Sequence, residues 1–260
     1  MGAGTAKLLG ETAERTVRTA LELGYSHVDT AEGYRNETEV GDALAGPNGE
    51  NCFVTSKVLP ANLHYEDVLS SLEASLDRLG RSAVDLYLIH WPNPAISLRE
   101  TLHAMERAHD RGLVRNVGVS NFSRYQLMFA LRVADVPIAV NQVEFHPWNP
   151  RPELLDYCRA HDVVVEAAAP LAQTRVLEDP TIRALADEYD RTPAQVTLRW
   201  AIQKGVVVLP RSASEAHLRE NATLFDWELD PDDVARVDAI DRRETVYGMD
   251  LEDDVYGIPA

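Results

Sequence analysis

Cysteine, lysine and long apolar runs are scarce in this chain of 260 residues. Its two cysteines, Cys52 and Cys158, are too few for a disulfide framework, so we expect a reducing compartment. No apolar run approaches the ~18 residues that a bilayer crossing needs, and the first residues show no basic stretch followed by an apolar one. These absences argue against a membrane-spanning or secreted protein and predict a cytoplasmic one.

Net positive charge is also lacking, because 42 Asp and Glu residues outnumber 25 Lys and Arg residues and leave a formal charge of −17. A surface this negative repels phosphates, which argues against a nucleic-acid partner. The acidic excess is spread along the whole chain and does not gather in one tail. Such an excess destabilises a fold by self-repulsion at low ionic strength and is screened by salt. We therefore expect a halophilic protein from a salt-rich cytoplasm.

Short β-branched runs alternate with longer amphipathic segments. Seven runs are typical of strands: 26–30, 52–57, 84–90, 114–120, 138–145, 163–169 and 206–210. A short stub over residues 2–5 is a possible eighth strand. The segments between and after them are typical of helices: 12–23, 37–45, 65–79, 98–110, 124–134, 153–161, 181–189, 193–203, 214–221 and 231–240. Strands that alternate with helices pair in parallel through right-handed crossovers.

This pattern predicts an α/β fold, a (β/α)8 TIM barrel, as a single domain over residues 1–260. The alternative is an open, doubly wound sheet, which usually has a glycine-rich turn between its first strand and first helix. Gly2 and Gly4 are not followed by a third glycine at that spacing. The closed barrel is therefore favoured.

In such a barrel, functional side chains lie where strands end and loops begin. Tyr34 lies in the loop that follows Asp29, and the remaining candidates are Asp29, Lys57, His90, Ser120, Asn121, Gln142, Arg211 and Ser212. Each has an ordinary structural explanation when taken alone. Asp29 would cap a turn, Lys57 would be solvated, and His90 would be a hydrogen-bonded core histidine.

Together, four of these side chains make a chemically coherent group. An ammonium at Lys57, placed between Asp29 and Tyr34, lowers the pKa of the phenol from its usual ~10. A phenol tuned in this way can give a proton near neutral pH, and a neutral His90 can donate a hydrogen bond to a substrate oxygen. These side chains suit carbonyl reduction, in which the carbonyl oxygen gains negative charge as hydride reaches the carbonyl carbon. We expect no metal, because potential ligands do not occur at useful spacing.

Five blocks of the sequence resemble the signature of the aldo-keto reductase superfamily, in its order and spacing: VDTAEGYRNETEVGDAL, FVTSK, VDLYLIHWP, VRNVGVSNF and NQVEFHP. The resemblance covers practically the whole chain and is greatest to the microbial branch that includes 2,5-diketo-gluconate reductases. It implies a monomeric (β/α)8 barrel that transfers hydride from NADPH to a small-molecule carbonyl. By motif position, it implies a catalytic tetrad of Asp29, Tyr34, Lys57 and His90, with Tyr34 as the proton donor.

The same resemblance implies where ligands bind. The nicotinamide carboxamide would contact Ser120, Asn121 and Gln142, and Trp91 would line the substrate pocket. The helix start in VVVLPRSASEAHLREN favours a phosphate through its free N–H groups and dipole, and a guanidinium adds a forked cation. The rest of the predicted cofactor site consists of Thr5, Pro170, Leu171, Arg211, Ser212, His217, Glu220 and Asn221.

Three departures from the family pattern affect these expectations. His217 replaces a usual arginine, so one fixed cation is lost and use of NADH becomes plausible. Ala168 replaces a tyrosine that stacks on the nicotinamide, which predicts weaker cofactor binding or a substitute aromatic. The usual N-terminal hairpin is reduced or missing, so either the sequence begins late or the first strand is short.

Two rival functions remain open at this stage. One is a cofactor-binding, redox-sensing barrel without significant turnover, although such a sensor need not keep the proton donor. The other is an unrelated barrel enzyme that uses Lys57 to form a Schiff base. We further expect Glu166 to pair with an arginine, and the short stretch after Arg243 to leave the substrate pocket open.

Overall fold

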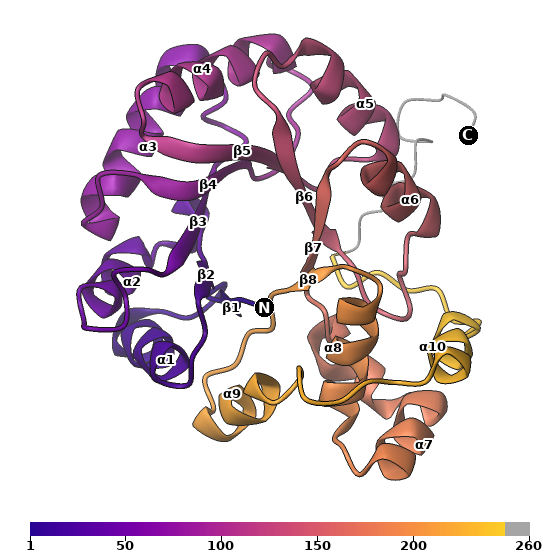
Figure 1. Ribbon diagram of the computed structural model, residues 1–260. Coiled ribbons are helices and arrows are strands. Elements are labelled where there is room, and N and C mark those ends of the chain that lie inside the picture. The colour runs from indigo at the N-terminus through magenta and orange to yellow at the C-terminus, as the bar shows by residue number, and fades with distance from the viewer. Residues whose placement is uncertain (248–260) are drawn as a thin grey trace.

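The computed structural model describes residues 1–247, which form a (β/α)8 barrel (Figure 1). All strand pairs are parallel and adjacent in sequence. The strands are β1 (Ala3–Gly4), β2 (His27–Asp29), β3 (Phe53–Val58), β4 (Val84–Ile89), β5 (Val114–Ser120), β6 (Ile138–Glu144), β7 (Val164–Ala168) and β8 (Val207–Val208). The predicted fold class is confirmed, and residues 248–260 of the predicted domain lie outside the described residues.

Two backbone hydrogen bonds join β1 to the end of the chain's last strand and close the sheet. The N–H of Gly2 donates to the carbonyl of Val208 at 2.9 Å, and that of Gly4 donates to Pro210 at 3.1 Å. A Cβ atom at Gly2 would lie only 2.7 Å from the side chain of Leu209. The ring of His27 lies 2.8 Å from the same position, so a larger residue would require these two side chains to shift.

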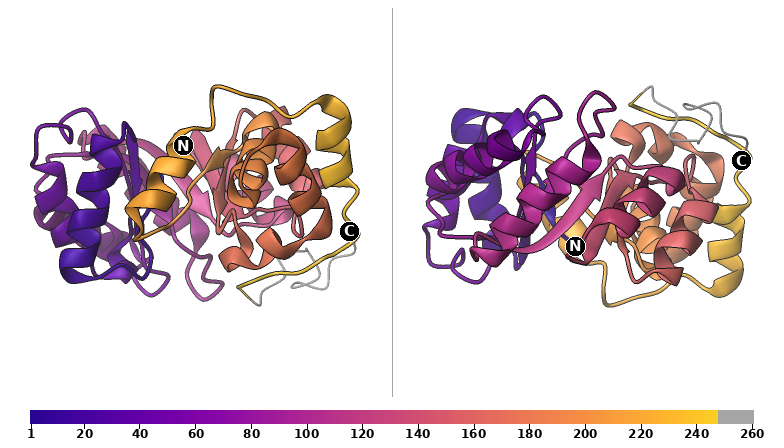
Figure 2. Two further views of the ribbon diagram at one scale, coloured as in Figure 1. Left: turned by 90° about the horizontal axis from the view of Figure 1, so that it is seen from below. Right: turned by 90° about the horizontal axis from the view of Figure 1, so that it is seen from above.

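The helices surround the strands on the outside of the barrel, as Figures 1 and 2 show. They are α1 (Gly10–Glu22), α2 (Glu37–Leu44), α3 (Tyr65–Leu79), α4 (Leu98–Asp110), α5 (Arg124–Val133), α6 (Pro152–Ala160), α7 (Pro180–Tyr189), α8 (Pro193–Gln203), α9 (Glu215–Ala222) and α10 (Pro231–Asp238). In both views of Figure 2 the segment after α10 returns along one end of the barrel. Each predicted helix is present, with its ends shifted by at most two residues.

Helix starts follow from capping in some places and not in others. Thr192 and Gln195 form the reciprocal capping box of α8, with Pro193 at the first helical position. Ser97 occupies the cap position of α4, but its side chain makes no capping hydrogen bond. The start of α4 therefore has no side-chain cap.

Some strands are shorter than the apolar runs that predict them, whereas β5 has the predicted bounds. The last run covers residues 206–210, yet only Val207 and Val208 pair with β7. Val206 is buried before the paired residues, and Leu209 is buried after them and donates its N–H to the Ala167 carbonyl at 3.3 Å. Hydrophobicity marks burial, and burial extends beyond the paired residues of a strand.

Several features of the first strand and the core agree with the sequence. Strand β1 has only two residues, Ala3 and Gly4, as the short first strand predicted. Cys52 and Cys158 are free and buried, and burial raises their thiol pKa values to about 11 and about 12. In this part of the chain, no helix has the length and apolar character that a bilayer crossing demands.

Candidate active site

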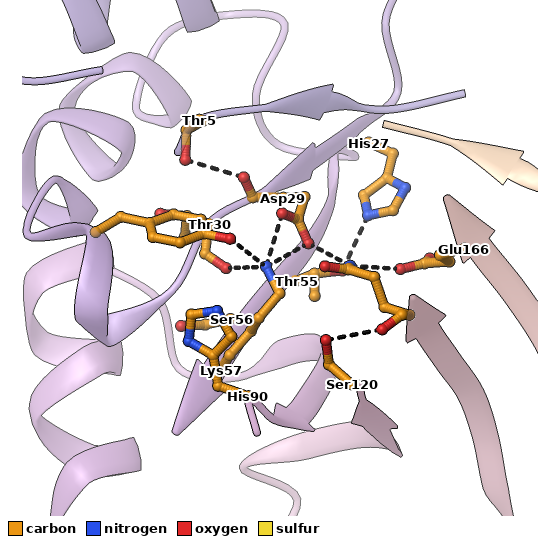
Figure 3. Close-up of polar contacts among 12 residues, drawn as sticks. Thr5, His27, Asp29, Thr30, Thr55, Ser56, Lys57, His90, Ser120 and Glu166 are labelled. Carbon is orange, nitrogen blue, oxygen red and sulfur yellow. Dashed lines mark hydrogen bonds and ion pairs between the residues drawn. The ribbon is translucent and has the colours of Figure 1, made fainter. Parts of the chain in front are cut away.

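A buried ion pair joins the ends of β2 and β3 (Figure 3). The Lys57 ammonium donates hydrogen bonds to both carboxylate oxygens of Asp29, at 2.7 and 2.8 Å, and to the carbonyl of Thr30 at 2.9 Å. Burial by itself lowers the pKa of Lys57, but the charges of Asp29 and Tyr34 outweigh it and raise this pKa above its ordinary value. Lys57 is therefore a fixed positive charge inside the barrel.

Tyr34 lies beside this ion pair at the end of a short 3-10 turn, η1 (Glu32–Tyr34). The Lys57 ammonium donates to the Tyr34 hydroxyl at 3.3 Å and lies 4.9 Å from the centre of the ring. Burial around the hydroxyl raises the pKa of Tyr34, Lys57 lowers it in part, and Asp29 raises it again. The expected net lowering of this pKa is therefore wrong. The phenol keeps its proton at neutral pH, and the role left to Lys57 is to stabilise the phenolate once the proton has gone.

His90 completes the group after β4. Its ring meets that of Tyr34 edge to face, with 5.5 Å between the ring centres. Burial, with Lys57 adding to it, lowers the pKa of His90 to about 4, so the imidazole is neutral at pH 7 as expected. Its buried Nδ1 has no partner among the described residues, so the ring has capacity for a further hydrogen bond.

The polar side chains at the ends of β5 and β6 are linked to the same group. Asn121, whose φ of 61° lies in the left-handed region that asparagine tolerates, donates from its amide to the His90 carbonyl at 2.9 Å. Ser120 donates to the backbone carbonyl of Gln142 at 2.8 Å. The Gln142 amide donates to Asp29 at 2.8 Å and to Glu166 at 2.9 Å. The structure therefore joins these positions into one network with the tetrad.

Glu166, on β7, departs from its sequence prediction. Its partner is the Gln142 amide, and within the described chain no arginine pairs with it. Burial, followed by the nearby charge of Asp29, raises the pKa of Glu166 to about 7. An arginine was expected because buried carboxylates are usually paired. Here an uncharged amide takes that place.

A cavity of about 360 Å³ opens over the network. Six predicted site residues line it: Asp29, Tyr34, Gln142, Pro170, Leu171 and Arg211. Tyr247 also lines it, as do Lys7, Gln173 and Thr174, which were missed. No sequence signal marks these last three, because each reaches the cavity through loop geometry. Lys7, Gln173 and Thr174 adopt left-handed backbone angles, with φ of 63°, 52° and 72°.

The segment before the end of the described chain forms part of the cavity wall. The Glu144 carboxylate accepts hydrogen bonds from the Thr245 hydroxyl and the Val246 N–H, both at 2.7 Å, and from the Tyr247 N–H at 3.1 Å. Tyr247 meets the ring of Trp91 edge to face, 6.3 Å away. Residues up to 247 therefore cover the rim beside Trp91, and the remainder of the predicted open tail lies outside the described residues.

Other predicted cofactor residues have partners within the protein. Thr5 donates to the backbone carbonyl of Asp29 at 2.9 Å, and Glu220 accepts a hydrogen bond from Thr192. Asn221 is buried, and its side chain bonds the Tyr25 hydroxyl. Ser212 lies 3.4 Å from Nδ1 of His217, next to the exposed Arg211. The adenosine end of the predicted site is thus divided between an exposed basic part and a buried structural part.

The geometry is suited to protonating an oxygen. A phenol that keeps its proton at pH 7 lies against a fixed ammonium, and a neutral imidazole with a free ring nitrogen lies beside it. In the described part of the chain, no three His, Cys, Asp or Glu side chains gather as metal ligands. The charged lysine is also poorly suited to act as a nucleophile, because Schiff-base formation needs the neutral amine.

Comparison with known proteins agrees with this geometry. Residues 1–242 match the aldo/keto reductase family. The chain is 40% identical to a glyoxal reductase of Bacillus subtilis over 91% of its own length and 86% of the relative's. A solved structure described as a "putative 2,5-diketo-D-gluconic acid reductase B" superposes with a TM-score of 0.89 at 37% identity, covering 91% of this chain and 85% of the other. An aldo-keto reductase of Bombyx mori in complex with NADP gives a TM-score of 0.89 at 30% identity, covering 98% and 92% of the two chains. With a family match over nearly its whole length and a fold shared at this identity, the chain belongs to the aldo/keto reductase family.

Proposed function

We propose that this protein reduces small aldehydes, ketones or keto-sugars to alcohols with NADPH, and that Tyr34 gives the proton. The observation that carries the proposal is the chain of contacts from Asp29 through Lys57 to the Tyr34 hydroxyl, at the wall of the cavity. Membership of the family and the reductase names of its relatives support carbonyl reduction. The alternative of a redox sensor without turnover has no support, because the four catalytic side chains are present and in contact.

The residues around the cavity fit a nicotinamide cofactor. Oδ1 of Asn121 is buried and has no partner among the described residues, so it has capacity to accept from a carboxamide. Lys7 and Arg211 add positive charge to the same cavity, which suits phosphate groups. We assign Ser120, Asn121 and Gln142 to the nicotinamide end and Arg211, Ser212 and His217 to the adenosine end. The bound NADP of the Bombyx mori relative supports this assignment.

When bound, the reduced nicotinamide supplies the hydride that reaches the carbonyl carbon. The protein's own residues act on the carbonyl oxygen. The neutral imidazole of His90 donates a hydrogen bond that orients this oxygen, and Tyr34 transfers its phenolic proton to it. The Lys57 charge stabilises the phenolate that is left, and Asp29 holds Lys57 in place.

Cofactor preference at the adenosine end rests on few cations. Arg211 is exposed and has a guanidinium suited to a 2′-phosphate, whereas His217 is exposed and offers no such forked cation. NADPH is therefore the preferred donor, with NADH as a usable second one. The lost stacking face at Ala168 weakens contacts that both cofactors share, so it lowers both affinities without changing this preference.

The surface charge supports a salt-rich cytoplasm as the working environment. Lys57 is buried at the site and Lys204 is paired with Asp238, so arginine provides almost all the positive charge that faces solvent. We propose a cytoplasmic monomer whose acidic surface needs salt for stability. Equal thermal stability with and without molar KCl would refute the salt requirement, and light scattering in KCl tests the monomer.

The function is tested by incubating the protein with NADPH and a panel of small carbonyls in KCl. Loss of absorbance at the reduced-nicotinamide band, with stoichiometric alcohol formed, is the expected result. NADPH that binds but is not oxidised with any carbonyl would favour the sensor. A protein that does not bind NADPH at all would contradict both functions.

A further inference from the structure

Glu166 is a buried carboxyl group inside the barrel that the proposed chemistry does not use. Glu166 is 3% exposed and lies on β7. Its partner in the register of the sheet is Gln142, on the adjacent strand β6. Oε2 of Glu166 accepts a hydrogen bond from Nε2 of Gln142 at 2.9 Å. The same Nε2 donates at 2.8 Å to Oδ2 of Asp29 (Figure 3). Gln142 therefore bridges a catalytic carboxylate and one with no assigned role.

The bridge leaves the Gln142 side chain only one way to bind a ligand. A primary amide has two N–H donors and one carbonyl acceptor. Both donors are engaged by carboxylates, and an ionised carboxylate accepts hydrogen bonds but donates none. Only Oε1 of Gln142 remains, and Gln142 lines the cavity. In this arrangement the side chain can accept a hydrogen bond from a ligand but cannot donate one.

Asp29 alone would engage one N–H and leave the second free for the cavity. Asp29 is already committed, because it accepts two hydrogen bonds from Lys57 in addition to the one from Gln142. The second carboxylate, at Glu166, removes the remaining donor. The acceptor character of Gln142 therefore depends on Glu166 as well as on Asp29 of the tetrad.

We propose that Glu166 is a positioning residue that takes the second N–H of Gln142, so that the site selects a cofactor with an N–H donor on the pyridine ring substituent. The inference rests on the proposed NADPH-dependent function and adds to it a reason for selectivity. A carboxamide provides such a donor. An acetyl group or a carboxylate at the same ring position provides only acceptors, and two facing acceptors repel.

The selectivity depends on pH because Glu166 titrates near neutrality. Asp29 faces it from β2, Lys57 from β3, Gln142 from β6 and the amino group of Met1 from the chain start, whereas β8 contributes only valines. Burial and Asp29 raise the pKa of Glu166 to about 7, against the opposing effects of Gln142, Lys57 and the Met1 amino group. Protonated Glu166 can donate through its hydroxyl as well as accept, so below that pH it no longer fixes the Gln142 amide with its oxygen toward the cavity.

Equilibrium binding of NADP and its 3-acetylpyridine analogue, measured by calorimetry in KCl at pH 8 and pH 6, tests the inference without turnover. For the wild-type protein at pH 8 we expect NADP to bind about tenfold more tightly than the analogue, the factor of one net hydrogen bond. At pH 6 the preference should fall toward unity. Glu166→Gln should show the low preference at both pH values. The matched control is Glu153→Gln, which changes an exposed carboxyl to an amide on α6 and should behave as wild type.

The outcomes separate this inference from the function on which it rests. If wild-type protein binds neither dinucleotide, the proposed function fails. If both bind with a preference that neither pH nor Glu166→Gln changes, the role of Glu166 is refuted and the function stands. Should Glu166→Gln not fold, the pH dependence of the wild-type preference decides alone. The ratio of NADP to NAD affinities should be the same in all proteins, because the 2′-phosphate lies at the other end of the cofactor.

Discussion

The ammonium of Lys57 lies 3.3 Å from the hydroxyl of Tyr34 and donates a hydrogen bond to it. Burial nevertheless keeps the pKa of Tyr34 above its ordinary value. The pair therefore does not hold a ready-made phenolate. Before reaction the phenol of Tyr34 is protonated, as a proton donor must be. Lys57 then stabilises the phenolate as it forms.

Removal of one partner of the buried ion pair should be more harmful to stability than removal of both. Lys57→Met leaves the Asp29 carboxylate buried without its cation, and we expect the free energy of unfolding to fall by about 3–5 kcal/mol. The double variant Asp29→Asn/Lys57→Met should regain most of this loss while remaining inactive. Urea denaturation in KCl measures the difference. A double variant that is no more stable than Lys57→Met would show that the pair is not the source of the loss.

His27 should make stability fall on acidification. Burial lowers the pKa of His27 from 6.5 to about 4, while its Nε2 lies 2.9 Å from the Thr55 hydroxyl. The unfolded chain therefore binds a proton at a higher pH than the folded one. The contribution is complete above pH 6.5 and is lost as the pH falls toward 4, by about 3 kcal/mol at most.

Denaturation of His27→Gln between pH 7.5 and 4.5 isolates this contribution, because glutamine keeps a hydrogen-bonding group but does not titrate. We expect the variant to lose less stability than wild type over this range. The matched control is His109→Gln, on the last turn of α4, which removes a histidine from the surface. Parallel curves for wild type and His27→Gln would contradict the prediction.

Glu144 should govern substrate binding through Tyr247. Burial alone would raise the pKa of Glu144, but His146 and the segment around Thr245 lower it to about 2, so the carboxylate accepts its hydrogen bonds throughout the working pH range. Glu144→Gln replaces one acceptor oxygen by a donor and releases part of the segment. We expect KM for carbonyl substrates to rise about three- to tenfold, as for one lost hydrogen bond, with kcat little changed.

Tyr247→Ala provides the comparison for Glu144→Gln, since it removes the ring without touching the anchor. Both variants should raise KM, and the double variant should raise it no further than Tyr247→Ala alone. Additive effects would show that Glu144 acts by another route.

Position 217 should determine part of the cofactor preference. His217 lies beside Ser212 and near Arg211, at the start of α9. His217→Arg adds a fixed cation there, and we expect NADPH affinity to rise about tenfold relative to NADH, as for one charged hydrogen bond. His161→Arg, at the end of α6, is the control for added charge. An unchanged ratio would show that residue 217 faces away from the phosphate.

Much of the site can be predicted from the sequence because a parallel barrel brings all its strand ends to one rim. Asp29, Lys57 and His90 are far apart in sequence, yet each lies at or just after a strand end, and this alone brings them together. The pattern of β-branched runs was sufficient to find those ends within one or two residues. Side-chain chemistry then indicated what the group does.

What the sequence could not predict depends on burial and loop shape. The pKa of Tyr34 is decided by the burial of its hydroxyl, which no spacing encodes. Glu166 was assigned an arginine because pairing rules do not anticipate an amide shared by two carboxylates. Gln173 and Thr174 reach the cavity through left-handed backbone angles that favour no particular residue pattern here.

The replacement of Tyr34 by phenylalanine tests the central claim most directly, because it removes one oxygen and leaves the ring that packs against His90. NADPH binding by calorimetry should equal that of wild type, while kcat for carbonyl reduction should fall by at least about 10²-fold. Tyr157→Phe, on the surface helix α6, should leave both unchanged. Turnover of a tenth or more of the wild-type rate in Tyr34→Phe, with the cofactor bound, would show that another group gives the proton.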